Sequence, residues 1–594
     1  MSFKQWFSIK KDQNARGLLL GGIVLFNVLL WIIASIISYL AYPDIYDGLP
    51  NALWSSALAW MLDPGNFDPN LPILIRILSV MVIIVSMITF TGGIIGYVAS
   101  LFSAFIDSAR QGKGKLLIKD HVLILNWNFK ALELIADYIH SELTTVVVLS
   151  DKDKGEVEAA IKRKLFDAHI TKKAMRKINV IVRTGQVFSR ADLDNVSIEC
   201  ARTVIILANE EEINKSGSVI DTLSMKTLML ATHMNIPKDQ TIIIEVVAPE
   251  TIQLINEHIS PNVGMHDRII AIYPDELMGS IIGQTILMPD LNSVYRELLS
   301  FEGAEFYTIP ACDPLEYLME HNYAVPIYPM SGLLYLLASC PEDIGKTRNE
   351  PLTIDKTVKL RRAIHAKDRS IVIFGKNRKL PFIIASLKRY QEEEKTHITI
   401  TMVDSNEPEV IAKSIQNLDH IDTILILSND QMDASECDSD VLVTLLMIQD
   451  IAKQHDAEIV IELLDPRHYD IAQGYNIRNT IISNEYISLF ISQLSKNRRL
   501  FDLIIDLLTY DEVGSDQETY ELYTYQADEI FAEKFPIHFA SASEMIISCR
   551  KESAGEVIVI GVIIDGKKRL FKGNLDQGEP ISLNAEDIVI AITK

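Results

Sequence analysis

The sequence has few of the residues that build disulfide frameworks and zinc sites. Only five cysteines occur among 594 residues, and no two of them form a C-x-x-C pair. This scattered spacing argues against a zinc ribbon or a disulfide scaffold and fits a reducing compartment. The five are Cys200, Cys312, Cys340, Cys437 and Cys549.

Common catalytic motifs are missing as well. The sequence contains no G-K-[ST], H-E-x-x-H or G-x-S-x-G pattern, which argues against the hydrolases that use them. It has no T-V-G-Y-G-like segment, the carbonyl filter of potassium-selective pores. A net charge of −23 and a pI of about 5.1 disfavour a nucleic-acid partner. We therefore expect a protein that is not an enzyme and does not bind nucleic acid.

What the chain does have is two long uncharged runs near its start. The first covers Gly17–Ala41, and the second covers Ile77–Ile106 with Arg76 at its outer end. Each run is long enough to cross a bilayer as a helix. Acidic Asp44 and Asp47 lie between the runs, while basic residues flank the outer ends of the hairpin. This charge bias predicts an integral membrane protein of the cell membrane with both termini in the cytoplasm.

The stretch between the two runs is typical of a re-entrant pore loop. Leu53–Met61 predicts a helix too short to span a membrane, and a tight Pro-Gly turn follows it. Non-helical backbone survives at membrane depth only inside protein or beside a water-filled path. Oxygens of Asp63 and Asn66 from several copies could then form an ion filter. The predicted pore residues are Leu62, Asp63, Pro64, Gly65, Asn66 and Phe67; the alternative is an ordinary extracellular hairpin.

Three glycines interrupt the second run, at Gly92, Gly93 and Gly96. One interpretation is close packing of this helix against the first. The other is a gate hinge, because glycine lowers the cost of bending a helix. The second run continues directly into the cytoplasmic part, so we expect it to line the pore.

The first cytoplasmic module reads as an α/β Rossmann-like domain. Apolar strands such as 121–125 and 145–149 alternate with helical segments, which predicts a parallel sheet. Asp151 ends the second strand, where a dinucleotide's ribose would bind, and Asn126 begins the turn after the first. That turn reads N-W-N-F-K-A and lacks the glycines of G-x-G-x-x-G. Whether a nucleotide binds to this module is therefore left open.

The second cytoplasmic module repeats this plan. Its strands include 370–374, 398–403, 423–427 and 459–463. The turn after the first strand, Gly375–Lys379, carries three cations, which could attract an anion. We favour the alternative that this is a solvated basic turn. Each sheet precedes a small α+β lobe, and Asp565-Gly566 predicts a hairpin in the last one. We divide the chain into a pore domain and linker at 1–118 and two modules at 119–365 and 366–594.

An acidic stretch follows a strand of the second module. Five carboxylates occur within residues 430–440, at Asp430, Asp433, Glu436, Asp438 and Asp440. Flexible carboxylates suit Ca²⁺, although the spacing is not that of an EF-hand. The alternative is a solvated loop whose acids cap the next helix, where negative charge is favoured.

These features together resemble channels gated by RCK modules, and more closely the CASTOR/POLLUX family of ion channels. The run from Leu62 to Phe67 looks like that family's filter, and 121–127 resembles its His-Val-Leu-x-x-Gly-Trp strand. The most specific likeness lies at 422–430 and continues at 438–451, and Ser483-Asn484-Glu485 matches a later motif. Asn126 stands where the family has glycine, and Phe67 where it has histidine. Plant members carry extra spans and a long N-terminal region that are not seen in this sequence.

The resemblance implies a homotetramer with a cytoplasmic gating ring. A ligand, with Ca²⁺ as one candidate and a nucleotide as another, would open or close a pore for K⁺, Na⁺ or Ca²⁺ in the bilayer. Because the family has bacterial relatives, we expect a prokaryotic source. The alternatives are a membrane-anchored, nucleotide-sensing regulatory subunit of a potassium transporter and, with less support, a membrane-bound NAD(P)-dependent oxidoreductase.

Overall fold

The computed structural model separates into two compact units, Met1–Gly114 and Lys115–Lys594, each of which we describe by itself. The predicted boundaries at 118/119 and 365/366 stay predictions. The residues described are 3–63, 69–110, 114–141, 145–167, 170, 178–209, 217–235, 237, 239–262, 268–301, 303–348, 352, 354, 356–361, 367–404, 408–415, 418–429, 434–475, 477–510 and 520–594.

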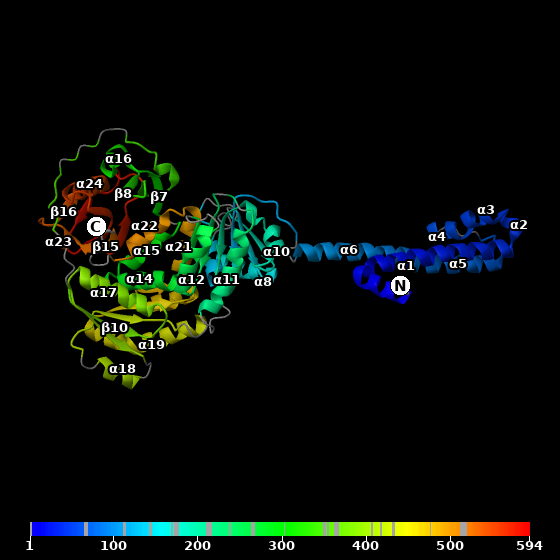
Figure 1. Cartoon of the computed structure of the whole chain (residues 1–594), viewed down its shortest axis with the longest axis horizontal. Coiled ribbons are helices and arrows are strands. Elements are labelled where there is room, and N and C mark those ends of the chain that lie inside the picture. The colour runs from blue at the N-terminus through cyan, green and yellow to red at the C-terminus, as the bar shows by residue number, and fades with distance from the viewer. Residues whose placement is uncertain are drawn as a thin grey trace. The chain divides into compact units, whose positions relative to one another are not determined.

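The first unit contains two helices long and apolar enough to cross a membrane. The apolar part of the first is Leu20–Ala41, and that of the second is Ile73–Ser103. Only 17% and 22% of these segments are buried within the chain, unlike the core helix of a soluble protein. The helices of the unit, seen in Figure 1, are α1 (Phe3–Ala41), α2 (Pro43–Tyr46), α3 (Leu49–Leu53), the π-helical η1 (Trp54–Leu58), α4 (Ala59–Leu62), α5 (Ile73–Ser86), the π-helical η2 (Met87–Thr91) and α6 (Gly92–Arg110).

The second unit begins with a six-stranded parallel sheet in the order β3-β2-β1-β4-β5-β6. Its strands are runs of Val, Ile and Leu, which suits a sheet covered on both faces. They are β1 (His121–Leu125), β2 (Thr145–Ser150), β3 (Asn179–Thr184), β4 (Ala201–Ile206), β5 (Thr241–Glu245) and β6 (Ile269–Ile272). The helices around them include α7 (Phe129–Asp137), α8 (Lys154–Asp167), α10 (Arg190–Asn195), α11 (Gly217–Thr232) and α12 (Pro249–Leu254).

A second parallel sheet has five strands in the order β11-β10-β12-β13-β14. The prediction of Rossmann-like parallel sheets is therefore confirmed. The strands are β10 (Arg369–Phe374), β11 (Ile398–Val403), β12 (Thr423–Ile426), β13 (Glu458–Leu463) and β14 (Asn479–Ile482). The helices include α17 (Leu380–Glu393), α18 (Pro408–Ile415), α19 (Ala434–His455) and α20 (Tyr469–Gly474).

Antiparallel strands follow each parallel sheet. The first set pairs in the order β7-β9-β8, the second in the order β15-β20-β17-β18, and β16 pairs with β19. The predicted hairpin is present, because β17 and β18 pair around Asp565 and Gly566, both with positive φ. These strands are β7 (Glu305–Pro310), β8 (Ala324–Met330), β9 (Leu333–Ala338), β15 (Glu521–Gln526), β16 (Ile537–Phe539), β17 (Val557–Ile564), β18 (Lys567–Leu570), β19 (Ile581–Leu583) and β20 (Ile588–Thr593).

One hydrophobic core joins the two parallel sheets. Helix α14 (Pro274–Leu287) leaves the first sheet and packs on α17 of the second, while α21 (Ser483–Lys496) leaves the second sheet and packs on α7 of the first. The other face of each sheet has a separate core of its own. Each module therefore covers the other, and the two sheets of this unit (Figure 1) depend on each other for burial.

Candidate functional site

The first candidate site is a crevice at the carboxyl ends of the strands in the first sheet. The strand order reverses between β1 and β4, and ligands of open parallel sheets bind at such a switch point. Two aromatic side chains line the crevice beside polar ones, which suits an organic ligand with a flat ring. The lining residues are Asn126, Trp127, Asp151, Lys152, Gln186, Val187, Phe188, Asn209 and Leu223.

Both predicted cofactor-binding residues, Asn126 and Asp151, lie in this crevice. Asp151 is exposed and follows β2, while Asn126 is buried and begins the turn after β1. The open space measures about 50 Å³, enough for a few waters but far below the size of a nucleotide. A nucleotide would therefore require the crevice to widen.

Asn126 explains why a glycine can be absent from this turn. Its φ is +79°, close to the +83° of Gly375, which occupies the same place after β10. Asparagine tolerates this left-handed conformation better than most residues because its short side chain can bond locally. Here the Nδ2 of Asn126 donates to the carbonyl of Leu207 at 3.3 Å, which ties β1 to β4 across the crevice.

The amides that would hold a phosphate are already occupied. Asn128 caps α7, and its Oδ1 accepts hydrogen bonds from the backbone N–H groups of Lys130 at 3.0 Å and Ala131 at 3.3 Å. Its Nδ2 donates to the carbonyl of Ala208 at 3.2 Å. A phosphate at this helix N-terminus would have to displace the side chain of Asn128.

A buried ion pair completes this turn. The Nζ of Lys130 lies 2.9 Å from Oε1 of Glu245, the last residue of β5, and the side chains are only 7% and 2% exposed. The other carboxylate oxygen of Glu245 accepts the N–H of Ala208 at 2.9 Å. The carboxylate therefore has two partners, as a buried charge requires.

The second module repeats this arrangement. Nδ2 of Asn377 donates to Glu462 at 2.9 Å, and Nζ of Lys379 lies 3.1 Å from the same carboxylate. Glu462 also accepts the Ser428 hydroxyl at 3.0 Å. The interpretation of residues 375–379 as a solvated basic turn is wrong for Lys379, which is 5% exposed. The sequence has an acid in β13 but gives no sign that it faces this lysine.

The structure describes three of the five carboxylates in the acidic stretch. Glu436 is exposed and Asp440 half-buried, while Asp430 and Asp433 lie outside the described residues. Asp438 is fully buried at the start of α19 and accepts the N–H groups of Leu464 at 2.8 Å and Asp465 at 2.9 Å. No cluster of three metal-ligating side chains occurs in the described part of the chain.

Asp221 has the same role in the first module. It is 1% exposed on α11 and accepts the N–H groups of Val247 at 2.8 Å and Ala248 at 2.9 Å. Burial raises the pKa of Asp221 and Asp438 alike, although these hydrogen bonds oppose the shift. The repetition indicates that each carboxylate fixes the loop after the neighbouring strand.

The second candidate site is the short helical segment of the first unit. Figure 1 shows α3 and α4 alongside α1 and α5, and residue contacts join these elements. Nε1 of Trp31 donates to the carbonyl of Leu53 at 2.7 Å, and Oγ of Ser56 lies 3.3 Å from that of Ser35. Trp60 is only 3% exposed in the same cluster. The segment Leu49–Leu62 is longer than the predicted helix and is packed against both candidate spans.

Of the predicted pore residues, the structure describes two. Leu62 ends α4, and Asp63 follows it in extended conformation, with its N–H donating to the carbonyl of Ala59 at 2.9 Å. Both side chains are exposed. Pro64, Gly65, Asn66 and Phe67 lie outside the described residues, so the filter stays a prediction.

The three glycines lie at the start of α6, immediately after the π-helical turn η2, which the sequence did not signal. A Cβ at Gly93 would lie 2.7 Å from Cδ1 of Ile23 on α1, whereas one at Gly96 would meet no atom within 4 Å. Gly93 therefore serves helix packing, and Gly96 is free to serve bending. A π-helical turn is itself a common site of helix kinks.

Comparisons with curated proteins point to ion channels. The chain is 23% identical to "Probable ion channel POLLUX" of Arabidopsis thaliana over 89% of its own length and 72% of that protein. It is 22% identical to "Ion channel CASTOR" of Lotus japonicus, over 86% and 68% respectively. It covers 60% of the length of the rice POLLUX protein. "Calcium-gated potassium channel TvoK" of Thermoplasma volcanium is 25% identical over 37% of this chain and 56% of that protein.

A solved structure gives the class of the fold. The human SLO3 gating ring matches 80% of this chain and 99% of its own with a TM-score of 0.50 and 13% identity. No protein-family model matches the chain. Over that part, the fold of the chain is similar to the fold of a channel gating ring. The chain is, moreover, a homologue of the CASTOR/POLLUX ion channels, which confirms the resemblance drawn from its motifs.

Proposed function

We propose that the chain is a ligand-gated cation channel that acts as a homotetramer. Asp63 and Asn66 of four copies form the ion filter, and the cytoplasmic parts form a ring of eight Rossmann-like RCK modules. The observation that carries this proposal is homology to named ion channels over 86–89% of the chain. Packing of Leu49–Leu62 against two apolar helices supports a re-entrant pore segment.

A flux assay tests conduction directly. The purified full chain is reconstituted into liposomes, and uptake of K⁺, Na⁺ and Ca²⁺ is followed separately. We expect cation uptake above that of empty liposomes and a changed ion preference in Asp63→Asn. Uptake equal to that of empty liposomes, with insertion verified, would favour the regulatory-subunit alternative. The relatives named above are channels, so they give no support to an oxidoreductase.

We propose Ca²⁺ as the gating ligand. This rests on the calcium-gated relative TvoK and on the carboxylates Asp430, Asp433, Glu436 and Asp440. Asp438 would contribute indirectly, because both of its oxygens already accept backbone hydrogen bonds. A ligand shifts the gate only by its difference in affinity for the two ring shapes. Liposome flux unchanged between chelator and millimolar Ca²⁺ would refute this assignment.

A nucleotide in the first crevice is the second candidate ligand. Trp127 and Phe188 offer ring surfaces, and Asp151 a ribose partner. The occupied amides at Asn128 oppose binding through phosphate. A fluorescence titration with NADH and ADP tests whether the crevice binds a nucleotide. Binding should change the fluorescence of Trp127 in the wild type, and the change should be missing in Trp127→Phe. We also propose that both termini lie in the cytoplasm, on the charge bias of the sequence, and that the source is a prokaryote, because the family that the chain resembles has bacterial relatives.

A further inference from the structure

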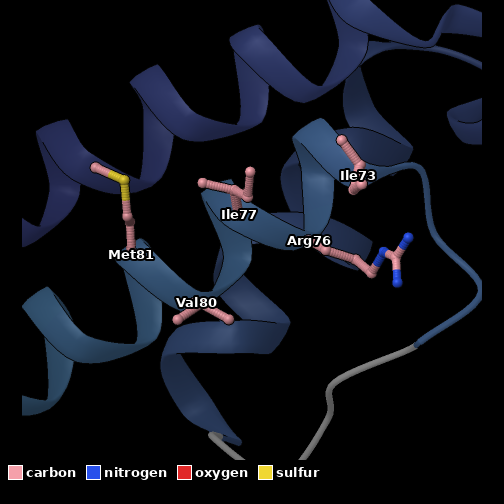
Figure 2. A pocket seen from close by; sticks show the side chains of 5 residues that line it. All are labelled: Ile73, Arg76, Ile77, Val80 and Met81. Carbon is pink, nitrogen blue, oxygen red and sulfur yellow. The ribbon is translucent and has the colours of Figure 1, made fainter.

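A shallow groove runs along one side of α5 in the first unit. Figure 2 shows the side chains that line it, with the guanidinium of Arg76 extending from the helix. The apolar members follow one another at helical spacing i, i+4, i+7 and i+8 and therefore share a face. Their exposed fractions run from 42% for Val80 to 70% for Ile73. The five are Ile73, Arg76, Ile77, Val80 and Met81.

Arg76 is an isolated cation. It is the only charged residue between Asp68 and Asp107. Its Nε is buried and has no hydrogen-bond partner among the described residues. An external anion cannot reach this buried atom, but the end of the guanidinium extends from the helix (Figure 2), and an anion there would offset the charge of the group.

The position of Arg76 along the helix matches the headgroup level of a bilayer. The apolar segment Ile73–Ser103 has 31 residues and would be about 46 Å long as a straight helix, close to the 40–45 Å of a whole bilayer. Arg76 is the fourth residue, about 4.5 Å from the start, within the polar layer of roughly 5–7 Å on each side. Ile77, Val80 and Met81 continue from there into the hydrocarbon.

We propose that this groove binds an anionic phospholipid. The phosphate accepts hydrogen bonds from the guanidinium of Arg76, and one acyl chain lies along Ile77, Val80 and Met81. A second copy of the chain is the competing occupant: its spans at 17–41 and 77–106 contain no acidic side chain to pair with Arg76, but the stretch between them carries Asp44, Asp47, Asp63 and Asp68, so the Arg76→Gln test below includes the number of copies. The proposal requires that α5 lies in a membrane but does not depend on ion conduction.

Native mass spectrometry of the delipidated full chain tests this. Phosphatidylglycerol and phosphatidylcholine with identical acyl chains are titrated, and the fraction of lipid-bound protein is measured. We expect a preference for phosphatidylglycerol of about fivefold, the effect of one basic residue near an anionic surface. Arg76→Gln should remove the preference, and Arg76→Lys should keep most of it. Val80→Trp, which fills the groove, should weaken binding of both lipids.

Two controls test whether the lipid preference belongs to this groove. Arg163→Gln removes an exposed cation on α8 of the second unit and should leave the preference intact. Soluble glycerophosphate should not compete at the lipid's concentration; competition would mean a free-phosphate site and overturn the proposal. An equal affinity for both lipids would overturn the proposal as well, and so would a preference that survives Arg76→Gln or falls in Arg163→Gln. It would also be overturned if the Arg76→Gln protein changed its number of copies while it bound lipid as before.

Discussion

Nζ of Lys379 lies 3.1 Å from Oε1 of Glu462, and Lys130 is related to Glu245 in the same way at 2.9 Å. In both modules the lysine is the fifth residue after the first strand, and the acid ends or nearly ends a strand across the crevice. The cation that could attract a phosphate is therefore neutralised within the module. Each turn that follows the first strand of a parallel sheet is therefore stabilised by an ion pair within its own module.

Loss of the second lysine should destabilise the second unit. Lys379→Met leaves Glu462, which is fully buried, without its cation. Breaking a buried pair from one side costs about 3–5 kcal/mol. Denaturant unfolding of the purified full chain, followed by fluorescence, should show this decrease.

A double variant and a surface control check the cause. Lys379→Met/Glu462→Gln should regain much of the loss, because no unpaired charge remains. Lys367→Met breaks a pair with Glu529 in which the lysine is 67% exposed, and it should change stability by less than about 1 kcal/mol. An effect of Lys379→Met as small as that of Lys367→Met would contradict the account.

Removal of the side chain at Asn126 should change stability less than addition of one at Gly375. Asn126→Gly loses one hydrogen bond but relieves the left-handed backbone, so we expect a change within about 0.5 kcal/mol. Gly375→Ala forces a side chain onto φ +83° and places its Cβ 2.9 Å from the carbonyl oxygen of Leu427. It should cost more than about 1–2 kcal/mol in the same unfolding experiment. Equal effects of the two variants would argue against equivalent turns.

His121 should make the stability of the second unit depend on pH. It is fully buried in β1, and Nε2 lies 3.2 Å from the carbonyl of Val196 while Nδ1 has no partner in the described part of the chain. Burial lowers the pKa of His121 below its ordinary value of 6.5. The unfolded chain therefore takes up a proton first as the pH falls below 6.5, and the folded chain loses stability there.

The loss is at most about 1.4 kcal/mol per pH unit for one group, and it is absent above pH 6.5. His121→Gln keeps a donor for Val196 and should flatten the decrease between pH 7 and pH 5. His538→Gln, an exposed histidine on β16, is the control and should not flatten it. A decrease of equal slope in wild type and His121→Gln would refute the assignment.

Gly96 should affect gating without affecting packing. Gly96→Ala meets no atom within 4 Å but stiffens α6 next to η2. Alanine favours a helix over glycine by about 1 kcal/mol, so the open probability should fall about fivefold if the helix bends to open. Gly21→Ala in α1 meets no atom within 4 Å either and serves as the matched control. Identical currents from both variants would exclude Gly96 as a hinge.

Most of the fold could be predicted from apolar periodicity. The strands 121–125, 398–403 and 459–463 were found within a residue or so, because a buried parallel strand is a continuous apolar run. Strands β6 and β14 were missed: each is short and runs almost directly into the helix that follows it, α14 or α21, so no turn signal marks its end. The exchange of α14 and α21 between modules was missed as well, because a sequence shows that a helix is apolar but not which module it covers.

The candidate sites were less predictable for a physical reason. A basic turn looks solvated until the acid that faces it is known, and Glu462 lies more than 80 positions after Lys379 in the sequence. The role of Asp438 was hidden in the same way, because its partners are backbone N–H groups of a distant loop. The repeat of Asn-x-Lys at 128–130 and 377–379 was a signal that could have revealed both turns.

Single-channel recording of the purified full chain in planar bilayers tests the central claim most directly. K⁺ is placed on one side and Na⁺ on the other, and Ca²⁺ is then added to the side that carries the second unit. We predict discrete openings, a reversal potential that shifts in Asp63→Asn, and an open probability that changes with Ca²⁺. A silent bilayer with verified insertion, or openings whose conductance and ion preference are the same in Asp63→Asn, would contradict the proposed pore.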